Sequence, residues 1–136
     1  TFSERKLLQK LVYLLQKFGI DFGFIYSWYL HGPYSPDLTR TLFEMAEVSP
    51  LHGGLSDQEL ATIHKLKSFL GDDIHSSDNL ELVVSIDYLR WYARRVGASD
   101  GEVLVVLKKT KPYFTEQEIR ESWRKSVELE EKVKIK

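Results

Sequence analysis

The sequence has 136 residues, with 19 basic and 20 acidic side chains and a formal net charge of −1 at pH 7. Its length predicts one domain over residues 1–136, and its near-neutral charge argues against a general attraction to nucleic acid or acidic lipid. The absence of cysteine excludes disulfide bonds and zinc sites built on thiolates, and it favours a reducing compartment.

The first predicted element is a helix that ends near residue 18. Apolar side chains recur at helical spacing from Leu7 to Phe18, and Gly19 fits a stop. Thr1 and Glu4 match a capping box at the start. The apolar stripe is broad, so we expect this helix to lie at the centre of the core.

The period changes to two at residues 20–30, where aromatic and apolar side chains alternate with small or polar ones. This pattern predicts a short strand or hairpin. Residues 32–33 are Gly-Pro and mark a turn. Ser35 suits an N-cap and Pro36 suits the first helical position, so a short helix is expected to follow.

Capping boxes predict the starts of the remaining helices. The pairs are Ser56 with Glu59, Asp78 with Glu81, Ser99 with Glu102, and Thr115 with Glu118. Residues 49–54 are expected to form a loop, and residues 127–136 are expected to fray. The fold class is therefore mainly α, a compact multi-helix domain with one short strand or hairpin after the first helix.

The sequence gives no sign of a membrane segment or of a secretion signal. The longest apolar runs, residues 11–15 and 103–107, are far shorter than the roughly 20 residues that cross a bilayer. The start of the sequence carries no hydrophobic signal segment, so we expect a cytoplasmic protein. Its single asparagine and methionine and its many Glu and Lys residues are typical of thermostable proteins.

No pattern indicates catalysis, a cofactor or a metal. The four histidines, His31, His52, His64 and His75, lack the close spacing of metal ligands. The sequence contains no Gly-x-Ser-x-Gly elbow and no glycine-rich phosphate loop. We therefore expect a non-enzymatic protein, and an enzyme with a site assembled from His31 and distant carboxylates stays open as a further alternative.

The aromatic turn after the first helix is a candidate partner-binding site. We assign Trp28, His31, Tyr34 and Arg40 to it, because aromatic side chains with a polar end are favoured as interface anchors. The competing interpretation is structural, since turn and capping chemistry accounts for most of residues 31–36.

Residues 90–111 hold six basic side chains against two acidic ones. The basic residues are Arg90, Arg94, Arg95, Lys108, Lys109 and Lys111, with Trp91 and Tyr92 among them. A solvated helical face explains such a run. If nucleic acid binds, this segment is the predicted site, and the order of helix, strand, turn and capped helix is compatible with a winged-helix regulator.

Four segments carry a resemblance to a known family. Residues 6–15 read KLLQKLVYLL, residues 29–38 YLHGPYSPDL, residues 80–89 LELVVSIDYL and residues 111–119 KPYFTEQEI. They resemble the YwgA-type proteins and, more distantly, the SocA-like antitoxin domain called Panacea. The resemblance implies a mainly helical fold and an antitoxin-like or regulatory adaptor with a protein partner such as a toxin; a homo-oligomer stays open.

Overall fold

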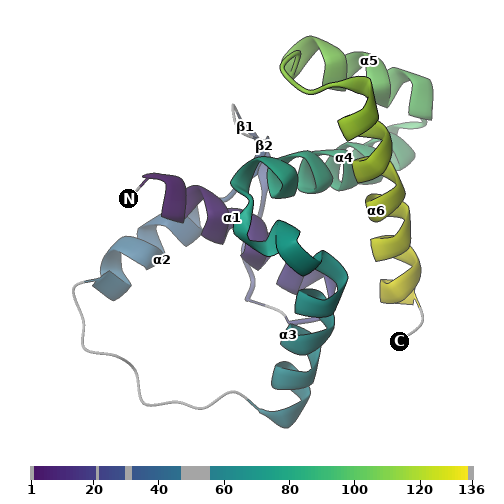
Figure 1. Cartoon of the computed structure of the whole chain (residues 1–136). Coiled ribbons are helices and arrows are strands. Elements are labelled where there is room, and N and C mark those ends of the chain that lie inside the picture. Colours follow the sequence, from purple (N-terminus) through teal and green to yellow (C-terminus); the bar gives the residue numbers. More distant parts are fainter. Residues whose placement is uncertain (1, 21, 30–31, 47–55, 135–136) are drawn as a thin grey trace. The chain divides into compact units, whose positions relative to one another are not determined.

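The computed structural model describes residues 2–20, 22–29, 32–46 and 56–134 (Figure 1). It is mainly helical with one two-stranded antiparallel hairpin after the first helix, which confirms the predicted fold class. The helices among these residues are α1 (Phe2–Lys17), α2 (Pro36–Ala46), α3 (Asp57–Leu70), the 3-10 helix η1 (Gly71–His75), α4 (Ser77–Val96), α5 (Asp100–Thr110) and α6 (Glu116–Lys134). The strands are β1 (Ser27–Tyr29) and β2 (Gly32–Tyr34).

The chain forms two compact units, residues 1–80 and residues 81–136. The division falls within α4, between Leu80 and Glu81. The first unit holds the hairpin and α1 to α3, and the second holds most of α4 with α5 and α6. The expectation that residues 1–136 fold as one domain stays a prediction.

Helix α1 supplies the apolar core of the first unit, as its periodicity predicted. Tyr13 and Leu14 are buried, as is Phe18 directly after the helix, and the Phe18 ring lies 6.2 Å from that of Phe69 in α3. Gly19 follows the helix with a φ of 109°, a backbone conformation that glycine adopts without steric cost. Thr1, expected to cap the helix, lies outside the described residues.

The strand predicted over residues 20–30 is much shorter, because β1 begins at Ser27. The backbone before it is paired by a side chain instead of a neighbouring strand. The Gln16 amide donates to the carbonyl of Phe24 at 3.1 Å and accepts from its N–H at 3.0 Å. This arrangement satisfies the backbone polar groups of Phe24 as a strand would, while Ile25 next to it is 77% exposed.

Three of the predicted capping boxes lie where the sequence placed them. Ser56 and Glu59 cap α3 reciprocally, and Thr115 and Glu118 exchange the same two bonds before α6. Ser99 accepts from the N–H of Glu102 at the start of α5.

The predicted loop at residues 49–54 lies outside the described residues. Ser35, the expected cap of α2, accepts from the N–H of Leu38 at 3.2 Å.

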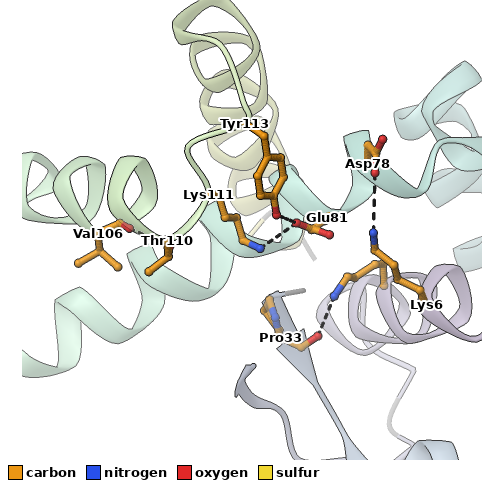
Figure 2. A network of polar contacts seen from close by, with 9 residues as sticks. Lys6, Pro33, Asp78, Glu81, Val106, Thr110, Lys111 and Tyr113 are labelled. Atoms are coloured by element: carbon orange, nitrogen blue, oxygen red, sulfur yellow. Dashed lines mark hydrogen bonds and ion pairs between the residues drawn. The ribbon is translucent and has the colours of Figure 1, made fainter. Parts of the chain in front are cut away.

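The fourth box, Asp78 with Glu81, was a wrong prediction. Helix α4 begins at Ser77, and the hydroxyl of Ser76 caps it by accepting from the N–H of Asn79 at 3.2 Å. Asp78 instead lies 3.7 Å from the ammonium of Lys6 (Figure 2). The carboxylate of Glu81 is buried and turned to other partners, which are described below.

The second unit packs around Leu82, Ile86, Leu107 and Ile119, which come from α4, α5 and α6. Helix α6 continues to Lys134, past residue 127, at which we expected fraying. Burial explains the difference, because Leu129 is fully buried on the inner face of this last part.

Candidate interaction surface

The structure describes three of the four predicted partner-binding residues, Trp28 and Tyr34 in the hairpin and Arg40 in α2. Trp28 lies opposite Pro33 in the antiparallel pair and is half-buried. Tyr34 is half-buried too, and its hydroxyl shares a 2.6 Å hydrogen bond with Thr39 of α2. Arg40 is exposed on α2 and lies 3.1 Å from Asp37.

His31, the fourth predicted residue, lies outside the described residues, so the site is incomplete as described. Tyr34 makes a second internal contact, since its ring centroid lies 5.2 Å from that of Tyr29. The side chain of Tyr34 therefore makes contacts that stabilise the hairpin. The role of Trp28, His31, Tyr34 and Arg40 in partner binding stays a prediction.

Buried polar side chains of α1 hold the hairpin and the start of α2. The amide of Gln9 donates to the carbonyl of Ser35 and to the hydroxyl of Thr39, both at 2.8 Å. Its oxygen accepts from the N–H of Ser35 at 2.9 Å. Lys10 donates to the carbonyl of Pro33 at 3.0 Å. Gln9 and Lys10 are each 1% exposed, so these bonds are shielded from water.

A second buried polar group lies in the other unit (Figure 2). The ammonium of Lys111 and the hydroxyl of Tyr113 both reach Oε2 of Glu81, at 2.8 and 2.7 Å. Glu81 and Lys111 are each 1% exposed, whereas the Tyr113 ring is 61% exposed. The charges of this pair are compensated inside the fold, as buried charges must be.

These two clusters contain four buried polar residues of the segments that carry the resemblance, Gln9, Lys10, Glu81 and Lys111. Gln9 and Lys10 belong to residues 6–15 and bond to residues 29–38. Glu81 belongs to residues 80–89 and bonds to Lys111 and Tyr113 of residues 111–119. The segments are thus coupled in two pairs by these buried side chains, which stabilise the fold, whereas other polar residues of the segments, such as Asp37 and Glu116, are exposed.

The basic segment, residues 90–111, is largely compensated by carboxylates of the second unit. Arg90 lies 3.2 Å from Glu130, donates to Ser126, and stacks 5.4 Å from the centre of the Trp123 ring. Arg94 forms a bidentate ion pair with the same Glu130. Lys108 bonds Glu116 at 2.8 Å, and Lys111 is buried against Glu81.

The electrostatics of these pairs favour their charged forms. The hydrogen bond to Glu130 raises the pKa of the Arg94 guanidinium further above its usual range. The hydrogen bond from Lys108, and then its charge, lowers the pKa of the Glu116 carboxyl. Of the six basic residues, Arg95 and Lys109 are exposed and have no carboxylate partner within 4 Å among the described residues.

An exposed aromatic stripe runs along α4 in the second unit. It consists of Tyr88, Trp91, Tyr92 and Arg95, at positions i, i+3, i+4 and i+7 of the helix, which share one face. Trp91 is 41% and Tyr92 51% exposed. The Trp91 ring lies 5.7 Å from that of Tyr88, and the Arg95 guanidinium lies 4.9 Å from its centre.

The apolar side chains of residues 82–96 lie on more than one face of α4, a pattern that predicts a largely buried helix. Residues 80–87 are buried on every face of the helix, including Val84 four residues before Tyr88, whereas Ala93 alone is buried among residues 88–96. Partial burial, with a smaller contribution from Tyr92, raises the pKa of the Tyr88 hydroxyl above its usual value, which favours the neutral form of Tyr88. Exposed Trp, Tyr and Arg together are the residue types that dominate binding energy at interfaces.

No family model, no curated protein and no solved structure matches this chain. The assignment of a function therefore depends on the residues themselves.

The described residues also offer no assembled metal or membrane site. No three His, Asp or Glu side chains among them come together as a group that could hold a metal ion. No helix in the described part of the chain is long and apolar enough to cross a membrane. His64 is exposed on α3, while His31 and His52 lie outside the described residues.

Proposed function

We propose that the chain is a non-enzymatic protein-interaction module, an antitoxin-like or regulatory adaptor of the kind that its resemblance to YwgA-type and Panacea proteins implies. The observation that carries this proposal is the aromatic stripe on one face of α4, where Trp91, Tyr92 and Arg95 are exposed next to the half-buried Tyr88. We propose a cytoplasmic location as well, in keeping with a sequence that has no cysteine.

The aromatic stripe is suited to a protein partner for energetic reasons. Large aromatic side chains lose little conformational entropy on binding and bury much apolar area, so they act as anchors. Val96 adds to the exposed apolar area, at 58% exposure on the same helix. A well-formed helix presents these groups in fixed positions, which lowers the cost of ordering them in a complex.

The polar clusters do not compete for the role of a catalytic site. The carboxylate of Glu81 is already bonded to Lys111 and Tyr113, and the amide of Gln9 is bonded on both its donor and its acceptor side. These groups have the contacts of structural side chains. This supports a binding function over a catalytic one.

A winged-helix-like nucleic-acid regulator is the second candidate, and the geometry of the basic segment weighs against it. Phosphate binding depends on cations that are free to replace counterions. Lys111 is buried, and Arg90, Arg94 and Lys108 are paired with carboxylates. Arg95 and Lys109 alone give a weak electrostatic attraction.

A pull-down with the tagged full chain from its native lysate, with and without nuclease, separates the two functions. We expect a stoichiometric protein partner that stays bound after nuclease treatment and when the salt concentration is raised from about 0.1 to 0.5 M, because salt screens apolar contacts little. Loss of the partner on nuclease treatment, or recovery of nucleic acid alone, would contradict the proposal. A second copy of the chain as the sole protein recovered would assign the surface to a homo-oligomer.

A further inference from the structure

Helices α5 and α6 enclose a groove of about 490 Å³ in the second unit. Its floor is apolar and consists of Leu104, Ile119 and Trp123. Its rim is charged and consists of Asp100, Lys108, Glu116, Arg120 and Arg124, all of which are exposed. None of these residues belongs to the aromatic stripe on α4.

The floor of the groove is held by the core beneath it. Leu104 and Trp123 are half-buried and pack against the cluster of Leu82, Ile86, Leu107 and Ile119. The α5 residues that line the groove, Asp100, Leu104 and Lys108, lie at intervals of four, so they follow one face for two turns. At 1.5 Å per residue the groove therefore runs for about 12 Å along α5.

The rim carries an excess of positive charge. Three cations stand against two carboxylates, and one of these, Glu116, is already bonded to Lys108 at 2.8 Å. Arg120 approaches Glu116 only to 3.9 Å and is 82% exposed. Arg124 makes no ion pair with any other residue that the structure describes.

We propose that this groove binds an acidic amphipathic helix of a partner protein. An apolar floor two turns long between two helices accepts the leucine face of a third helix, and Arg120 and Arg124 attract carboxylates at its edge. A nucleic-acid strand is disfavoured, because the apolar floor with Leu104 and Ile119 offers no partner to phosphates or to the polar edges of bases. The groove is separate from the aromatic stripe, so this proposal does not rest on the function assigned to that stripe.

The probe is a fluorescein-labelled synthetic peptide of about 16 residues, long enough to be helical, with leucine on one face and glutamate elsewhere. Its binding to the full chain is followed by fluorescence anisotropy at low salt. We expect saturable binding that is at least about tenfold tighter than that of the same peptide with lysine in place of glutamate. Equal affinity for the two peptides, or no saturation by either, would overturn the proposal.

The charge reversals Arg120→Glu and Arg124→Glu together are expected to lower the affinity for the glutamate peptide at least about tenfold. Both side chains are exposed, so the fold is retained. Lys65→Glu, an exposed lysine of α3, is the control with the same change of charge per site and is expected to leave the affinity within about twofold. If the double variant bound the glutamate peptide as tightly as the wild type does, the assignment would be overturned. The same holds if millimolar free glutamate, or a second copy of the chain, displaced the peptide.

Discussion

Replacing Lys111 by alanine is expected to lower the free energy of unfolding by about 3–5 kcal/mol. The substitution removes the ammonium that lies 2.8 Å from Glu81 and leaves that carboxylate buried, with 1% of its side chain exposed. The hydroxyl of Tyr113 remains as a partner, but it does not supply the missing positive charge. Urea denaturation followed by circular dichroism measures the change.

Lys109→Ala is the matched control for this prediction. Lys109 lies two residues away on α5 and is exposed, so its loss is expected to change the free energy of unfolding by less than about 0.5 kcal/mol. The double variant Glu81→Leu, Lys111→Met removes both charges and is expected to be more stable than Lys111→Ala alone. If Lys111→Ala were as stable as Lys109→Ala, the pair would not have the structural role assigned to it.

Replacing Gln9 by alanine is expected to cost about 2–3 kcal/mol of unfolding free energy. The change removes three hydrogen bonds and leaves the N–H and the carbonyl of Ser35 without their side-chain partner in the interior. Ser35 is fully buried, so water does not replace the lost bonds. The change is measured by urea denaturation, as for Lys111.

Gln58→Ala provides the comparison, because Gln58 is an exposed residue of the helix α3. It is expected to be neutral within about 0.5 kcal/mol, since alanine is a better helix former and no buried bond is lost. A loss in Gln9→Ala no larger than that in Gln58→Ala would mean that the amide does not hold the hairpin and α2 to α1.

Local signals predicted the parts of this fold that depend on local contacts. The box of Ser56 and Glu59 spans three residues, and the structure has both of its bonds. The box of Asp78 and Glu81 has the same spacing and was wrong. Glu81 bonds instead to Lys111, thirty residues further on, and nothing in the spacing of the capping box reveals a partner at that distance.

In the candidate sites too, features that depend on neighbouring residues could be predicted, whereas contacts with residues far along the chain could not. The charge of residues 90–111 could be counted, but the carboxylates that compensate it, Glu116 and Glu130, lie outside that range. The spacing of Tyr88, Trp91, Tyr92 and Arg95 was visible in the sequence. Their exposure was not, because it depends on which faces of α4 the rest of the chain covers.

A paired substitution in the aromatic stripe on α4 tests whether this surface binds the protein partner. The full chain carrying Trp91→Ala and Tyr92→Ala is compared with wild type in quantitative pull-downs, with the melting temperature measured in parallel. Phe22→Ala with Ile25→Ala, an exposed apolar pair of the first unit, is the matched control. We predict at least about tenfold less partner with the stripe variant, an unchanged yield with the control, and folded protein in both. Equal recovery of the partner by a folded stripe variant would contradict the account.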